Sequence, residues 1–164
     1  MILRIILAIG LLGILGCTKN PATGESDFTL FMSPAQETRI GAQEHSKIIH
    51  RFGGVYDDPL LGGYIATIGG RLVANSEMPN YVFTFTILNS QDVNAFALPG
   101  GYVYVTRGLI ALANSEAELA SVIAHEIGHI VARHTAQRYS HAMAGEIGGV
   151  LLGAIFNVQG LGNI

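Results

Sequence analysis

Charged side chains are scarce in this sequence, and cysteine occurs only once. Lys, Arg, Asp and Glu together make up 13% of the 164 residues, whereas hydrophobic residues make up 49%. That balance excludes an intrinsically disordered chain. With a formal net charge of −3 it also argues against a nucleic-acid partner. A single Cys excludes an internal disulfide, there is no internal repeat, and the length suits one domain with one core.

The apolar run near the N-terminus is too short to span a membrane. Residues 5–16 form a run of 12 apolar residues and glycines that follows Arg4. A transmembrane helix needs about 20 such residues. A run of this length after a positive charge is typical of a signal peptide. We therefore expect residues 1–16 to be an export signal.

The end of this run suggests a lipid anchor. Ile14-Leu15-Gly16-Cys17 resembles the bacterial lipobox. The resemblance implies cleavage before Cys17 and lipidation of that residue, which anchors a chain to a membrane without spanning it. Thr18 at the next position implies the outer membrane. An ordinary signal with an incidental Cys is the alternative.

The rest of the chain predicts a short tether and one domain. Residues 17–32 are polar and rich in turn-forming residues, and residues 33–164 form the domain. Caps and hydrophobic periodicity predict helices at 33–51, 57–75, 107–113 and 116–141, with strands at 81–88, 95–98 and 102–106. Helices, then a small sheet, then a long helix form an α+β pattern. The uncharged tail, 147–164, is expected to be a core helix or a membrane-surface contact.

The long helix contains a candidate metal site. His125-Glu126-Ile127-Gly128-His129 has the form H-E-x-x-H. Histidines four residues apart share a helix face, so both imidazoles can reach one metal ion, and Zn²⁺ accepts such ligands. Glu126 can then take a proton from a zinc-activated water and pass it to the leaving amine. The motif predicts His125 and His129 as metal ligands and Glu126 as the catalytic base; two solvated histidines on a surface helix are the alternative.

The surroundings of the motif favour a buried site. Ser115-Glu116-Ala117-Glu118 forms a capping box that starts the helix. Large apolar residues line one side of this helix and small residues line another. A helix buried on most sides cannot easily accommodate two unpaired histidines, and a shared metal ion would satisfy both.

The candidate substrate-binding segment runs from residue 94 to residue 106. A peptidase must hold its polypeptide substrate extended, and an exposed strand edge does so through main-chain hydrogen bonds. Within this segment we expect Asn94, Ala95, Phe96 and Gly101 to contact the substrate. A plain hairpin without a substrate role is the alternative.

Several stretches together carry a resemblance to a known family. Residues 94–109 (NAFALPGGYVYVTRGL), 116–120 (EAELA) and 125–134 (HEIGHIVARH), with N-P-x-T-G at 20–24, resemble the zinc metallopeptidases that include HtpX, the CaaX prenyl proteases and the BepA-like periplasmic proteases. The resemblance implies a zincin-like (gluzincin) fold, zinc bound by His125 and His129, and Glu126 as general base. It also implies quality control of envelope proteins on the periplasmic side of the outer membrane.

The sequence departs from this family at the third zinc ligand. The family takes it from a Glu on a later helix, whereas the only carboxylate side chain after His129 is Glu146, which lacks the family's motif. On a continuous helix His134 lies about 140° from His129, so we expect it to face away from the metal, packed or hydrogen-bonded near the site. The sequence therefore predicts a gluzincin domain whose C-terminal part is missing.

Three functions are consistent with this sequence. The first is a lipid-anchored periplasmic zinc endopeptidase, or the N-terminal part of one. The second is a catalytically inactive, chaperone-like module that binds polypeptides without cutting them, because a third ligand is absent. The third is a fragment without function.

Overall fold

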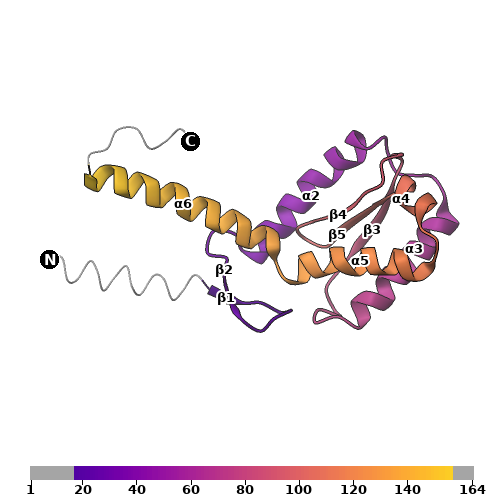
Figure 1. The fold of residues 1–164 in the computed structure, drawn as a ribbon, viewed down its shortest axis with the longest axis horizontal. Coiled ribbons are helices and arrows are strands. Elements are labelled where there is room, and N and C mark those ends of the chain that lie inside the picture. Colours follow the sequence, from indigo (N-terminus) through magenta and orange to yellow (C-terminus); the bar gives the residue numbers. More distant parts are fainter. Residues whose placement is uncertain (1–16, 157–164) are drawn as a thin grey trace.

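The computed structural model describes residues 17–156. Its elements, in order, are β1 (Cys17–Lys19), β2 (Ser26–Phe28), α2 (Pro34–Arg51), α3 (Pro59–Ala74), β3 (Thr84–Leu88), β4 (Ala95–Leu98), β5 (Tyr102–Thr106), α4 (Arg107–Leu112), α5 (Glu116–Val131) and α6 (His134–Phe156) (Figure 1). The predicted α+β class is confirmed. The predicted export signal and the last residues of the tail, 157–164, lie outside the described residues.

The main sheet has three strands in the order β3-β5-β4. β3 runs parallel to β5, and β4 runs antiparallel to it, so β4 is an edge strand. Successive side chains of β5 point to opposite faces. Val103 and Val105 join the apolar core with residues of α3 and α5, whereas Tyr102 and Tyr104 meet the ring of His45 on α2. The sheet therefore lies between α2 on one face and α3 with α5 on the other.

Side-chain caps start the helices where the sequence predicts them. The Ser33 hydroxyl accepts a hydrogen bond from the Gln36 N–H, and the Gln36 side chain accepts one from the Ser33 N–H. The Ser115 hydroxyl accepts from the Glu118 N–H at the start of α5, but the Glu118 carboxylate accepts from the Asn114 N–H and not from that of Ser115, so the predicted capping box is only half formed. These bonds satisfy backbone donors that the first helical turn leaves free. The caps thus set the register in which α2 and α5 present their side chains.

β3 is shorter than predicted at its N-terminal end. It begins at Thr84, whose partner on β5 is Tyr102, the first residue of that strand. Residues 81–83 have no partner residues on β5, so they do not extend the strand. Tyr81 instead closes a turn with the Met78 carbonyl, at 3.0 Å.

The turn between β4 and β5 packs directly on α2. A Cβ atom at Gly41 would lie 1.9 Å from the Pro99 carbonyl oxygen, so only glycine allows this approach. Gly100 and Gly101 have φ angles of 84° and 94°, a region that favours glycine. These glycines hold the end of β4 against α2.

The segment expected to be a tether contains a hairpin that packs on the domain. β1 and β2 pair antiparallel around a turn in which the Asn20 side chain accepts from the Ala22 N–H at 2.9 Å. The following chain contacts α6: the Phe31 N–H donates to the Ser140 hydroxyl at 3.2 Å. Strands of three residues are too short for the sequence to show alternation. Of the helices that the structure describes, none has the length and apolar character needed to cross a membrane.

The prediction of one continuous helix over residues 116–141 is wrong. α5 ends at Val131, and α6 begins at His134 after a turn at Ala132 and Arg133. Arg133 has a φ angle of 52°, a left-handed conformation that interrupts an α-helix and disfavours non-glycine residues. We refer to residues 132–134 as the corner.

Candidate active site

The histidines and the glutamate of the H-E-x-x-H motif gather on α5. One ligand atom from each of His125, Glu126 and His129 lies within 4.8 Å of the others. The two imidazole ring centroids are 4.6 Å apart, with an angle of 76° between the ring planes. Ile123 and Ile127, buried on another side of α5, fix this helix against the core. Two imidazole nitrogens at this separation fit a Zn²⁺ ion.

Glu126 differs from its two neighbours in burial. It is 8% exposed, whereas His125 is exposed and His129 is half-buried. Burial raises the pKa of the Glu126 carboxyl above its usual range, and the positive charges of His129 and His125 oppose that shift. A raised pKa brings a carboxylate closer to the operating range of a general base at neutral pH.

A cleft of about 560 Å³ opens beside Glu126 and His129. The edge strand β4 contributes Ala95, Phe96 and Ala97 to its wall, and the following turn contributes Pro99 and Gly100. The other walls come from five places in the chain: Lys19 and Pro21, Pro34 and Glu37, Met78 and Tyr81, Ile130, and finally Arg133, Thr135 and Arg138. The candidate base therefore faces a cleft that runs along a strand edge.

The residues predicted to bind substrate fall into two pairs. Ala95 and Phe96 line the cleft. Asn94 instead bonds to Thr106, whose N–H donates to the Asn94 carbonyl at 3.0 Å and whose hydroxyl accepts from the Asn94 N–H at 3.1 Å. Gly101 lies in the turn, where its carbonyl accepts from the Thr84 N–H. The structure thus brings only half of this predicted set to the cleft.

Strand geometry identifies a wall residue that the sequence reasoning missed. Because residue 94 forms a hydrogen-bonded pair with residue 106, alternation along the antiparallel ladder turns the backbone groups of Ala95 and Ala97 toward the free edge. Ala97 also lines the cleft. The two-residue period of the strand was the signal that could have found it.

His134 is hydrogen-bonded near the site, as expected, but its ring lies against His129 instead of facing away. The two Nδ1 atoms are 2.6 Å apart, and the ring centroids are 4.9 Å apart. The corner causes this difference, because the turn at Arg133 removes the helical rotation on which the expectation depended. Burial lowers the pKa of His134, and the positive charges of His129 and Arg138 act in the same direction.

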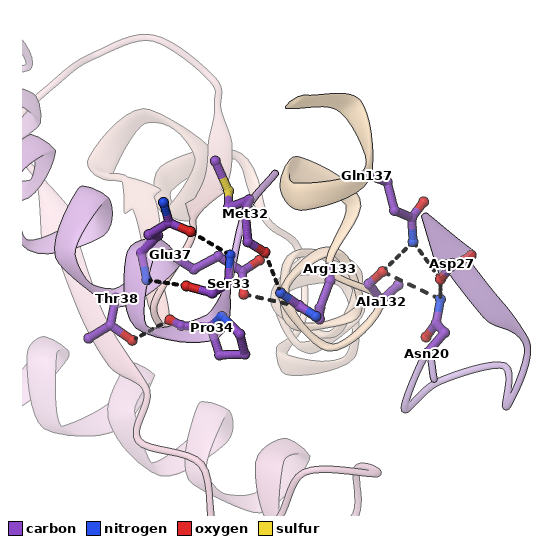
Figure 2. Close-up of polar contacts among 11 residues, drawn as sticks. Asn20, Asp27, Met32, Ser33, Pro34, Glu37, Thr38, Ala132, Arg133 and Gln137 are labelled. Atoms are coloured by element: carbon purple, nitrogen blue, oxygen red, sulfur yellow. Dashed lines mark hydrogen bonds and ion pairs between the residues drawn. The ribbon is translucent and has the colours of Figure 1, made fainter. Parts of the chain in front are cut away.

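Polar contacts from distant parts of the chain hold the corner (Figure 2). The Arg133 guanidinium donates to the Glu37 carboxylate at 3.1 Å and to the Met32 carbonyl at 2.9 Å. The Ala132 carbonyl accepts from the side chains of Gln137, at 2.7 Å, and Asn20, at 3.4 Å. Burial raises the pKa of the Glu37 carboxyl, and Arg133 opposes that shift.

Glu146 does not join the candidate metal-binding group. It is exposed on α6. In the part of the chain that the structure describes, His125, Glu126 and His129 form the one group of His, Cys, Asp or Glu side chains close enough to share a metal ion. The described residues therefore supply two candidate histidine ligands and the candidate base.

Comparison with known proteins identifies the family. The model of peptidase family M48 matches residues 59–161. The beta-barrel assembly-enhancing protease of Yersinia pestis is 48% identical over 80 residues, which cover 49% of this chain and 16% of that protein. The protein of the same name from Escherichia coli K12 is 42% identical over 81 residues, covering 49% of this chain and 17% of that protein.

A eukaryotic relative extends the comparison. The mitochondrial metalloendopeptidase OMA1 of Schizosaccharomyces pombe is 33% identical over 114 residues, covering 66% of this chain and 33% of that protein. This chain thus matches a third or less of the length of each of these relatives. Since the family model covers more than half of the chain and includes the whole H-E-x-x-H helix, this chain belongs to peptidase family M48.

Proposed function

We propose that this chain carries the catalytic helix of a zinc-dependent metalloendopeptidase with a zincin-like fold. The observation that carries the proposal is the group of His125, Glu126 and His129 beside a cleft that β4 borders. His125 and His129 would hold Zn²⁺, and peptidases of this family are in general zinc-dependent. The bound ion would supply Lewis acidity, which lowers the pKa of a water and offsets charge on the reacting carbonyl oxygen.

Residues of this chain carry out the proton transfer and hold the substrate. Glu126 accepts a proton from the attacking water and delivers it to the amine nitrogen that leaves. The outward N–H and C=O groups of Ala95 and Ala97 hold an extended polypeptide by adding a strand to the edge of the sheet. The substrate class is therefore an unfolded or extended polypeptide segment rather than a folded surface.

We also propose that the protein works in the bacterial envelope. The lipobox-like sequence ending at Cys17 supports a lipid anchor on the periplasmic side of the outer membrane. Two relatives named as beta-barrel assembly-enhancing proteases support a role in quality control of envelope proteins. Metabolic labelling with a fatty-acid analogue tests the anchor: label on the wild-type protein and none on Cys17→Ser is the expected result.

The decisive test is Glu126→Gln in the full-length protein. Loss of the proton acceptor should lower proteolysis of an unfolded substrate such as casein by about 10²- to 10⁴-fold. Zinc content, measured by mass spectrometry, should stay at the wild-type level, because both histidines remain. His125→Ala, which should lose the zinc, is the control. Proteolysis retained in Glu126→Gln would exclude Glu126 as the catalytic base.

A second candidate is a polypeptide-binding module without catalysis. The presence of only two histidines in the described metal group favours it. Such a module should suppress aggregation of an unfolded client equally well with and without EDTA, and should hold no more zinc than His125→Ala. Loss of client binding in EDTA would count against it.

A further inference from the structure

The contact between His129 and His134 leaves one nitrogen of His129 for a metal ion. His129 Nδ1 lies 2.6 Å from His134 Nδ1. A hydrogen bond between two ring nitrogens requires one of them to carry the proton and the other to accept it. Since this contact occupies His129 Nδ1, only Nε2 of His129 remains to bind a metal.

We propose that His134 is a positioning residue that holds His129 in the tautomer required for metal binding. His129 donates its Nδ1 hydrogen to His134 Nδ1, so the lone pair of His129 Nε2 stays free for the ion. The partner of the second ring nitrogen fixes both the tautomer and the ring orientation of a metal-binding histidine. This inference rests on the proposed function, which assigns the metal to His125 and His129.

The geometry assigns His134 to this supporting position rather than to the metal itself. Among the described residues, the group that can share one ion contains His125, Glu126 and His129 without His134. The His134 ring nitrogen on this side, Nδ1, is taken up by its contact with His129. The rings of His129 and His134 meet edge to face, at 62°.

The corner sets the position of His134 through bonds on both sides of it. On one side Arg133 is clamped by Glu37 and by the Met32 carbonyl. On the other, the Gln137 N–H donates to the Arg133 carbonyl at 3.1 Å, starting α6. The hairpin also contacts the corner, because the Asn20 side chain donates a hydrogen bond to the Ala132 carbonyl. A side chain anchored this way can orient its neighbour without large rearrangement.

Zinc affinity of the full-length protein tests the proposal. Competition with a chromophoric chelator should show that His134→Ala weakens zinc binding by about 10- to 100-fold, the usual cost of losing such a partner. His134→Asn should recover much of this loss, because its amide oxygen can take the place of Nδ1. His141→Ala, which changes another histidine of α6, should match the wild type.

Three results would overturn the proposal. The first is a His134→Ala protein with wild-type zinc affinity. The second is a His134→Ala protein as free of zinc as His125→Ala, which would make His134 a ligand. The third is a loss in His134→Asn equal to that in His134→Ala. If the wild type itself holds no more zinc than His125→Ala, the proposed function fails rather than the role of His134.

A spectroscopic measurement on the metal-free protein separates positioning from general destabilisation. Nitrogen-15 NMR of the histidine side chains should show His129 protonated at Nδ1 and unprotonated at Nε2 in the wild type. His134→Ala should shift His129 away from this tautomer, and His141→Ala should not. An unchanged tautomer in His134→Ala would contradict the proposal even if zinc affinity had fallen.

Discussion

Helix α5 and the corner that follows it bring histidines to one place by different means. His125 and His129 lie four residues apart on one helix, so helical geometry alone places them together. His134 reaches His129 only because Arg133 adopts a left-handed conformation. The bond from Arg133 to Glu37 spans 96 residues of sequence, and the bond from Asn20 to Ala132 spans 112.

This difference predicts how each part responds to substitution. Any change that preserves α5 should preserve the pair of proposed metal ligands, because its geometry is local. The position of His134 depends on α2 and on the N-terminal hairpin, so changes far from the metal should alter it. The cleft shares this dependence, since Lys19, Glu37 and Arg133 all line it.

The largest effect should come from within α5. His129→Ala should lower zinc affinity by more than about 100-fold, because it removes a ligand rather than a supporting group. The thermal transition of the metal-free protein should change little, since His129 is half-buried and its neighbours Ile127 and Val131 keep the helix in the core. Zinc per chain and circular dichroism measure the two quantities. An Arg133 variant that binds zinc as weakly as His129→Ala would contradict the expected difference between α5 and the corner.

Substitution of Arg133 should have an intermediate effect. Arg133→Ala should lower the free energy of unfolding by about 2–3 kcal/mol, because it leaves the buried Glu37 carboxylate without its cation. Arg133→Gly loses the same contacts but relieves the left-handed conformation, so it should be more stable than Arg133→Ala by up to about 1 kcal/mol. Urea unfolding distinguishes the two variants. The reverse order would show that the corner does not need a left-handed residue.

The hairpin should make the smallest contribution. Asn20→Ala removes side-chain bonds to the Ala132 carbonyl and to Asp27, at a cost of about 1 kcal/mol. Gln137 still bonds to the Ala132 carbonyl, so the corner should persist. Thr23→Ala, in the exposed hairpin turn, is the control, and should change stability by less than about 0.5 kcal/mol. Equal effects of the two substitutions would show that the hairpin does not support the corner.

The parts of the fold predicted from the sequence are those with a local signal. Ser33 and Ser115 mark helix starts through caps. β4 and β5 have their predicted bounds because Pro99, Gly100 and Gly101 separate them and β5 consists of aromatic and β-branched residues. The end of α5 carried no such signal, since Ala132 and Arg133 are ordinary helix formers. Asn94 and Gly101 were expected to contact substrate, but pairing with Thr106 and the turn geometry leave them outside the lining of the cleft.

The sequence by itself determined that the proposed metal ligands and base lie together, because a helical repeat places His125, Glu126 and His129 without help from the rest of the chain. Only the tertiary structure decided where α5 stops and what surrounds the site. A left-handed arginine has no sequence signature of its own; it persists because Glu37 and Met32, distant in sequence, satisfy its guanidinium. Contacts of that kind stabilise a conformation that local preference disfavours. They bring His134 to His129 and complete the cleft.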